Sequence, residues 1–320
     1  MAKRNTLHTL LLPLSTKARE DENDLGFGQK VTSKRLILSN GGFNIERQGS
    51  RVFNPYQDLI EVSWGKFFLL IILTFIGVNI FFAICFLLCG STAFSGISSS
   101  SIFYDFLYLF FFSVQTFTTV GYGSMSPMGI AANLVAAICA LVGLMGFALA
   151  TGLFFARFSK PKSQIIFSSK AIVTRYKDNK GFQFRLANRR NNKIINAKIE
   201  VTASWLEEID HKIERRYVSL PLERSTVSML PLNWTVVHPI EKSSPLCKMK
   251  PEDFKEAHME FLVQLEAYDE SYSQTIYTNT SYTWEEMLWG VRFSPMYYTD
   301  AESGKTILEL DKIDKMEPLV

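Results

Sequence analysis

The residues best suited to do chemistry lie in one short stretch, Thr118–Gly123 (TTVGYG), which has glycines at alternate positions. Glycine adopts left-handed backbone angles without a steric cost, so such a segment can turn successive carbonyl groups toward one side. Four copies around an axis would stack rings of carbonyl oxygens in place of the water shell of a potassium ion. The oxygens would come from Thr119, Val120, Gly121 and Tyr122, with a ring of Thr119 hydroxyls below.

Long apolar segments flank this stretch, and Asp105 is the sole Asp, Glu, Lys, Arg or His between Lys66 and Arg157. The run from Phe67 to Leu88 is long enough, at about 22 residues, to cross a bilayer. A second run, from Met128 to about Phe158, is longer than a bilayer needs and should tilt or project into the cytoplasm. The segment from Phe106 to about Thr116 is too short to span. It therefore predicts a re-entrant pore helix whose C-terminal end directs partial negative charge toward a cation.

The first span is preceded by a short amphipathic segment. Asn54 can cap a helix and Pro55 suits its first position. Because this helix runs directly into the span, we expect it to lie in the membrane interface, with Trp64 as an interfacial aromatic residue. The alternative is a surface helix of a soluble arm.

Charge fixes the orientation that we expect. Lys and Arg are absent from the loops between the spans and plentiful at both ends of the chain. We therefore expect a multi-pass protein of the inner membrane with both termini in the cytoplasm. The apolar run near the N-terminus is too interrupted for a signal peptide, and the net charge of +3 argues against nucleic acid as a partner. Residues 1–50 should form a cytoplasmic arm with a candidate edge strand at Arg35–Leu38.

The C-terminal part alternates apolar and polar residues with a period of two, which indicates strands with one buried face. The clearest runs are Phe182–Leu186, Ala197–Trp205 and Met259–Ala267, and Lys250–Ala257 is typical of a capped helical turn. The pattern predicts a β-sandwich. It contains no nucleophile–base pair and no phosphate loop, so an enzyme is the least favoured class. We interpret His238, in an apolar strand-like run, as a structural histidine.

The second span carries a candidate pore face. Gly143, Phe147, Thr151 and Phe155 recur every four residues on roughly one side of the helix. Phe155 could close the conduit by a ring of four aromatic side chains, although membrane aromatics are more often packed or face lipid. The glycine at 143, like those at 146 and 152, permits either bending or close helix packing.

Three further groups of residues have two interpretations each. Arg157, Lys160 and Lys162 follow the second span and either set orientation only or also attract anionic lipid. Glu266, Asp269 and Glu270 either line a cytoplasmic vestibule that concentrates cations or lie in a solvated loop. The four cysteines have no metal-like spacing, and we expect no cofactor apart from K⁺ in the filter.

Taken together, the two spans, the TVGYG stretch and the segment Ala156–Lys162 resemble the inward-rectifier potassium channels, most closely their prokaryotic branch. The resemblance covers roughly residues 50 to 310 and includes the segments Phe182–Leu186, Thr235–Ile240, Ser244–Leu246 and Glu286–Gly290. It implies a homotetramer whose cytoplasmic domains are immunoglobulin-like sandwiches. It also implies that Phe155 occupies the helix-bundle constriction and that Arg157, Lys160 and Lys162 meet anionic lipid headgroups.

Three positions depart from the family pattern. Strongly rectifying relatives carry an acid at the position of Phe147, so we expect weak rectification. Relatives often carry Glu at the position of Gln115 and Asp at that of Ser124, the two positions that support the filter. Both residues are neutral here and can support it only by hydrogen bonds.

The sequence therefore predicts a membrane α plus all-β chain with three parts, listed here as residues 1–50 (arm), 51–162 (interfacial helix and two-helix pore domain) and 163–320 (cytoplasmic β-sandwich). The function that we expect is passive, K⁺-selective conduction, gated from the cytoplasmic side by lipid or another ligand. A weakly selective cation channel is one alternative. The other is a membrane-anchored binding or sensor protein, which leaves the re-entrant segment unexplained.

Overall fold

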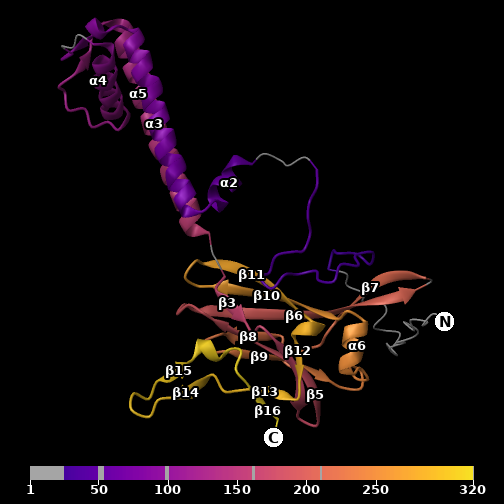
Figure 1. The fold of residues 1–320 in the computed structure, drawn as a ribbon. Helices are drawn as coiled ribbons and strands as arrows, with labels where there is room; N and C mark the ends of the chain where they lie inside the picture. The colour runs from indigo at the N-terminus through magenta and orange to yellow at the C-terminus, as the bar shows by residue number, and fades with distance from the viewer. Residues whose placement is uncertain (1–24, 50–53, 98–100, 161–162, 210, 320) are drawn as a thin grey trace. The chain divides into compact units, whose positions relative to one another are not determined.

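The computed structural model describes residues 25–49, 54–97, 101–160, 163–209 and 211–319. The chain forms two compact units (Figure 1). One comprises residues 49–160, which we call the pore unit. The other comprises residues 161–320 together with the arm up to Gln48, and we call it the cytoplasmic unit after the side of the membrane that the sequence predicts for it. Each unit is described by itself.

In its described residues the pore unit has one short α-helix and three longer ones: α2 (Pro55–Glu61), α3 (Trp64–Leu88), α4 (Ile102–Phe117) and α5 (Gly129–Ser159). In α2 the Asn54 side chain accepts a hydrogen bond from the Gln57 amide at 3.3 Å and Pro55 opens the helix, as the sequence predicts. Helix α4 begins one turn earlier than expected. Ser101, with extended backbone, is its N-cap, and Asp105 falls in the first turn.

Helices α3 and α5 are long and apolar enough to cross a membrane, with mean hydropathies of 2.7 and 2.4. Packing within the unit is largely aromatic: the ring of Phe86 lies 5.5 Å from that of Phe94 and 5.1 Å from that of Phe112. These contacts hold the short helix α4 against α3, which is how a helix too short to span can remain at membrane depth.

A buried polar contact joins the same helices. Ser113 Oγ on α4 donates to Asn79 Oδ1 on α3 at 2.8 Å, and the Asn79 amide group donates to the Phe75 carbonyl at 2.9 Å. Cys139 Sγ on α5 lies 3.9 Å from the same hydroxyl. This contact was not among the expectations from the sequence, although a lone asparagine in an uncharged span was the signal that could have indicated it.

The cytoplasmic unit is built around two five-stranded sheets. The first has the order β11-β10-β6-β7 with β8 beside β6, and its strands are β6 (Ile194–Ile209), β7 (Lys212–Ser219), β8 (Thr226–Met229), β10 (Glu260–Asp269) and β11 (Gln274–Thr283). The second has the order β12-β4-β5-β3 with β9 beside β5, and its strands are β3 (Ile165–Phe167), β4 (Ala171–Tyr176), β5 (Asn179–Asn188), β9 (Trp234–Ile240) and β12 (Met287–Trp289). Pairing is antiparallel except between β12 and β4.

Smaller elements complete the two units, all within the described residues. They are η1 (Ser91–Ala93), β1 (Phe94–Ser95) and β2 (Ser126–Pro127) in the pore unit, and α6 (Pro251–Glu256), η2 (Trp284–Glu286), β13 (Val291–Phe293), β14 (Tyr297–Thr299), β15 (Thr306–Leu308), η3 (Leu310–Lys312) and β16 (Met316–Pro318) in the cytoplasmic unit. Two of the predicted strands lie within β5 and β6, the third lies within β10 apart from its first residue, Met259, and the predicted helical turn is α6.

Aromatic side chains from the two sheets meet in the core. The ring of Phe182 on β5 stacks on that of Phe261 on β10 at 4.3 Å, and both side chains are fully buried. Strand β5 departs from the predicted alternation, because every residue from Gly181 to Ala187 is buried. Its second face is covered by the C-terminal segments, where Ala187 packs with Met296 and Ile313.

The arm differs from the expectation of an edge strand at Arg35–Leu38. Ile37 forms a single bridge with Phe43, inside the arm itself. Leu36 and Ile37 are 2% and 0% exposed and form a buried cluster with Tyr217 and Leu262 of the first sheet. Residues 25–48 are therefore held in the cytoplasmic unit by buried side chains rather than by strand pairing.

Candidate functional site

The stretch after α4 has left-handed backbone at alternate residues. The φ angles are +60° at Thr119, +54° at Gly121 and +80° at Gly123. The left-handed conformation expected of the two glycines is confirmed. Thr119 is an addition that the sequence analysis missed, because its side chain makes this conformation costly by about 1–2 kcal/mol. Backbone strain of this kind at a β-branched residue is found mostly at functional sites.

The last turn of the pore helix holds the beginning of this strand. The Gln115 carbonyl accepts hydrogen bonds from the amides of Val120 at 2.9 Å and Gly121 at 3.4 Å, and the Thr118 hydroxyl donates to the Val114 carbonyl at 2.7 Å. The support from Gln115 that the structure displays thus comes from its main chain. An ionisable side chain at this position is not needed for these bonds.

The other end of the strand is held by the small antiparallel sheet of β1 and β2, which pairs the segment before α4 with the segment after the strand. A methyl group on Gly96 would lie 2.3 Å from the Ser124 carbonyl oxygen, so only glycine allows this approach. The Met128 amide donates to the Ala93 carbonyl at 2.7 Å, and the hydroxyls of Ser95 and Ser126 lie 2.6 Å apart. The strand is therefore anchored at both ends by main-chain contacts.

Between these anchors the strand is open. Val120 and Tyr122 are 53% and 78% exposed in the single chain, and Thr119, Gly121 and Gly123 are exposed as well. One chain therefore presents a row of main-chain groups without enclosing an ion.

The four candidate pore residues of α5 do not form one set. Gly143 is buried, and a methyl group there would lie 2.0 Å from the Phe117 carbonyl oxygen. Close packing against the end of α4 is therefore the reason for glycine at this position. Phe147 and Phe155 are each 73% exposed, and the exposed Thr151 donates its hydroxyl to the Phe147 carbonyl at 2.9 Å.

Arg157 is not free to meet lipid, contrary to the expectation. It is 9% exposed, and its guanidinium donates to the carbonyls of Leu59, Ile60 (3.0 Å) and Val62 (2.7 Å) at the end of α2. The rings of Trp64 and Phe67 lie 4.5 Å and 4.3 Å from the guanidinium carbon. A cation is favoured there because the C-terminal end of a helix carries partial negative charge, and the rings add cation–π attraction. We call this arrangement the Arg157 clamp.

The neighbouring lysines differ from Arg157. Lys160 Nζ lies 3.2 Å from a carboxylate oxygen of Glu61, and both side chains are about half exposed, at 47% and 51%. Exposed pairs of this kind stabilise weakly, so Lys160 remains available to other anions. Lys162 lies outside the described residues.

Of the three candidate vestibule acids, Asp269 does not fit that role. It is 3% exposed and accepts the Ser271 amide at 2.9 Å, so it caps the turn between β10 and β11. Glu266 is exposed and accepts the Tyr277 hydroxyl at 3.3 Å, and Glu270 lies 3.3 Å from Lys193. Two of the acids therefore remain at the surface of the cytoplasmic unit.

The structural interpretation of His238 is confirmed. Its Nδ1 lies 2.6 Å from the Pro221 carbonyl, which can only accept, so Nδ1 carries the proton. Its Nε2 lies 2.8 Å from the Ser244 hydroxyl and accepts from it. Burial lowers the pKa of this imidazole.

Two membrane-length helices flanking a short helix and a strained strand define a subunit of a pore-loop ion channel. Comparison with known proteins agrees with this class: residues 82–160 match the family model "Ion channel", and residues 165–319 match "Inward rectifier potassium channel C-terminal domain". The chain is 33% identical over 296 residues to the inward rectifier potassium channel Kirbac3.1 of Paramagnetospirillum magnetotacticum, covering 91% of this chain and 98% of that one.

Mammalian relatives are more distant. The chain is 25% identical to ATP-sensitive inward rectifier potassium channel 14 of Homo sapiens, covering 80% of this chain and 62% of the relative. It is also 25% identical to ATP-sensitive inward rectifier potassium channel 11 of Mus musculus, covering 93% and 82%. The chain belongs to the inward-rectifier potassium channel family. It is thus a membrane-spanning ion channel subunit and not an enzyme, and channels of this family are tetramers.

Proposed function

We propose that Thr119–Gly123 is the K⁺ selectivity filter of a homotetramer of this chain. The observation that carries this proposal is the left-handed backbone at Thr119, Gly121 and Gly123. Alternating left- and right-handed residues turn successive carbonyls toward the same side, where they can replace the hydration shell of an ion. The exposure of the strand in a single chain supports a site that four chains complete.

The gate that we propose is the ring of four Phe155 side chains near the cytoplasmic end of α5. The exposure of Phe155 supports this role, because a residue packed inside its own chain could not reach a shared axis.

With neutral Phe147 along the same pore, conduction is only weakly rectifying. Both chain termini lie on the cytoplasmic side, where Glu266 and Glu270 attract cations.

Gating by anionic lipid on the cytoplasmic side is assigned to Lys160 and Lys162, with Arg157 holding α2 beside Lys160. Positive charges next to a membrane surface contribute about 1 kcal/mol each to the attraction of anionic lipid. The half-exposed Lys160 supports this division of roles, and so does the occupied guanidinium of Arg157.

A weakly selective cation channel is the second candidate. It is favoured by the neutral side chains of Gln115 and Ser124, which supply no ionised support, and the two bonds from Gln115 to the strand come from its main-chain carbonyl. Such anchors leave the strand freer to adjust its width, which lowers discrimination between K⁺ and Na⁺.

Rubidium uptake into liposomes that contain the purified tetramer tests the proposal. Added K⁺ should inhibit rubidium uptake by the wild type, and added Na⁺ should not. Gly121→Ala should abolish this selectivity, because a side chain destabilises a backbone φ of +54°. Gly77→Ala is the matched control: Gly77 lies within α3, and a methyl group there meets nothing within 4 Å. Equal competition by Na⁺ in the wild type would favour the second candidate. An unchanged ratio in Gly121→Ala would remove the filter from this stretch.

A further inference from the structure

The first sheet of the cytoplasmic unit holds the main chain of the arm. The Tyr217 hydroxyl donates to the Gly28 carbonyl at 3.2 Å, and the amide of Arg215 donates to the Gln29 carbonyl at 2.8 Å. The guanidinium of Arg215 donates to the carbonyls of Val31, at 3.0 Å, and Ser33. All these acceptors are carbonyls, so the polar contacts of β7 recognise the path of the main chain, and the buried side chains of Leu36 and Ile37 add apolar packing against Tyr217.

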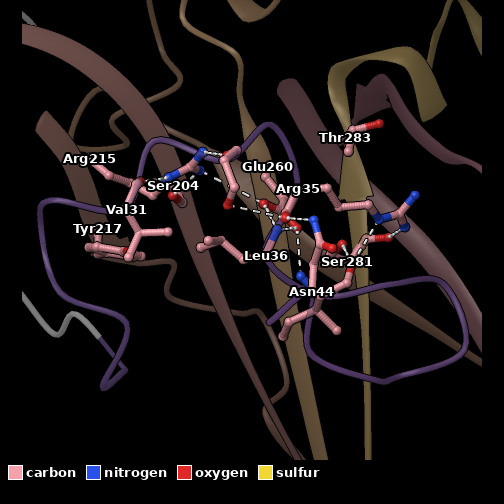
Figure 2. Close-up of polar contacts among 12 residues, drawn as sticks. Val31, Arg35, Leu36, Asn44, Ser204, Arg215, Tyr217, Glu260, Ser281 and Thr283 are labelled. Atoms are coloured by element: carbon pink, nitrogen blue, oxygen red, sulfur yellow. Dashed lines mark hydrogen bonds and ion pairs between the residues drawn. The ribbon is translucent and has the colours of Figure 1, made fainter. Parts of the chain in front are cut away.

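Glu260, at the start of β10, has the complementary role. Its carboxylate accepts the amide of Leu36 at 2.8 Å and that of Ile37 at 3.2 Å, and Ser281 Oγ donates to the Ile37 carbonyl at 2.5 Å. Figure 2 shows the side chains of Arg215 and Glu260 among these arm residues. Arg215 thus donates hydrogen bonds to carbonyls of the arm, and Glu260 accepts hydrogen bonds from its amides.

Arg215 and Glu260 are stabilised in their buried positions by hydrogen bonds to the arm as well as by their attraction to each other. Arg215 Nη1 lies 3.8 Å from Glu260 Oε2, and both side chains are 0% exposed. Burial raises the pKa of the Glu260 carboxyl and lowers that of Arg215. A buried ion pair is tolerated when further hydrogen bonds satisfy both partners, and here Ser204 and the arm supply them. Because these partners are main-chain groups of one segment, water can replace them when that segment leaves.

The arm is also connected to the pore unit through the chain. It ends at Gln48, and α2 begins at Pro55, so few residues separate the two. The other end of α2 is held by the Arg157 clamp, two residues beyond Phe155 on α5. This covalent route from the first sheet to the end of α5 is separate from the direct one through residues 160–165.

We propose that Arg215 and Glu260 form a receptor for the main chain of residues 28–37, and that the docked arm restrains the gate through α2 and the Arg157 clamp. Release of the arm frees α2 and raises the open probability. This inference rests on the proposed gate at Phe155. The occupant of the receptor is the chain's own arm, and the recognition is of backbone polarity, which side-chain substitutions at the exposed arm residues leave intact.

Hydrogen exchange and rubidium uptake on the full-length channel in liposomes test the proposal together. Glu260→Gln keeps the shape but removes the charge that accepts two amides. Exchange across residues 28–44 should become about tenfold faster, since a lost charged hydrogen bond is worth that factor or more, while the strands β5 and β6 stay protected. Uptake should rise about fivefold, at the lower end of couplings between distant sites. The matched control is Glu256→Gln on the exposed side of α6, which should change neither reading.

An arm that stays protected in Glu260→Gln overturns the receptor. Faster exchange with unchanged or reduced uptake overturns the restraint. If Glu260→Gln does not fold, Leu36→Ala loosens the docking from the arm side without altering the sheet, and Thr32→Ala at an exposed arm residue is its control. The filter is assessed separately by the K⁺-to-Na⁺ ratio. A wild-type channel without selective uptake contradicts the proposed function. A selective wild-type channel whose uptake is unchanged by Glu260→Gln and by Leu36→Ala, as by their controls, contradicts only the arm proposal.

Discussion

The pore unit and the cytoplasmic unit bury their apolar residues in opposite ways. In the most apolar parts of α3 and α5, 22% and 11% of residues are buried within the chain, and Phe147 and Phe155 are mostly exposed. In the cytoplasmic unit, Phe182, Phe184 and Phe261 are fully buried between the sheets. One unit has a closed core, and the other depends on lipid and on further copies of the chain to cover its surface.

This difference indicates where a substitution will act. A change in the closed core alters the stability of the cytoplasmic unit by itself. A change in the pore unit alters assembly or conduction, because the free energy of that unit includes partners outside the chain. The predictions that follow test this division, beginning with the largest effect.

Gly143→Ala should abolish ion uptake. The new methyl group would lie 2.0 Å from the Phe117 carbonyl oxygen, so the end of α4 must move, together with the strand after it that we propose as the filter. Liposome uptake of rubidium measures the loss, and Gly77→Ala in α3, where a methyl group has open space, should retain wild-type uptake. The unfolding midpoint of the cytoplasmic unit should be the same in both variants. Normal uptake by Gly143→Ala would contradict the close packing of α5 on α4.

Phe182→Ala should destabilise the cytoplasmic unit by about 3–5 kcal/mol, the usual cost of truncating a buried phenylalanine. Its ring stacks on Phe261 at 4.3 Å and no solvent reaches it. Phe155→Ala, which truncates an exposed ring of the same type, should leave this stability unchanged and raise uptake. Denaturant unfolding followed by tryptophan fluorescence measures the first effect. A similar loss of stability in both variants would break the distinction between the two units.

Arg157→Gln should lower the thermal stability of the tetramer and change uptake even in liposomes without anionic lipid. The expected cost is about 1.5–3 kcal/mol, the range for hydrogen bonds to a charged group. Lys160→Gln removes an exposed charge 3.2 Å from Glu61, and should change only the response to anionic lipid. If Arg157→Gln behaves like Lys160→Gln, then Arg157 is a lipid ligand and not a clamp.

Acid should weaken the cytoplasmic unit through His238. Burial lowers the pKa of this residue below its ordinary 6.5, so the unfolded chain binds a proton at a higher pH than the folded one. The stabilisation is complete above pH 6.5 and is lost as the pH falls from there through the folded pKa. Ser244→Ala removes the hydroxyl that occupies Nε2, and should cost about 1 kcal/mol at neutral pH.

The control for this pH effect is His211→Gln, because the His211 side chain is fully exposed. Unfolding curves at about pH 7.5 and 5.5, on either side of an ordinary histidine pKa, give the comparison. His238→Gln should flatten the difference between the two curves, whereas His211→Gln should not. An equal effect of the two substitutions would show that the acid sensitivity arises elsewhere.

Much of the architecture could be predicted from local patterns. The uncharged runs, the Asn54 cap followed by Pro55, and the period-two strands each depend on neighbouring residues only, and each appears in the structure. The candidate site was predicted less completely. The glycines at 121 and 123 indicated left-handed backbone from the sequence alone. Threonine at 119 gave no such indication, because its conformation is imposed by the hydrogen bonds around Gln115.

The misplaced residues have one cause in common. Arg157 follows a span and is typical of a lipid contact by composition, and its partner carbonyls at Leu59 and Val62 lie 98 and 95 residues earlier in the chain. Asp269 belongs to an acidic run, and only the turn between β10 and β11 shows that its carboxylate is used internally. Composition reports which groups are charged but not which partners the fold brings to them.

By itself the sequence determined the helices of the pore unit and the longest strands of the sandwich, because helix caps, apolar length and alternating patterns act between neighbouring residues. It also determined the backbone freedom at Gly121 and Gly123. Only the tertiary structure decided that Gly143 fits against Phe117, and that Glu260 holds the Leu36 amide from 224 residues away. Contacts of this kind depend on the packing of distant segments, and their free energy is present only after the chain has folded.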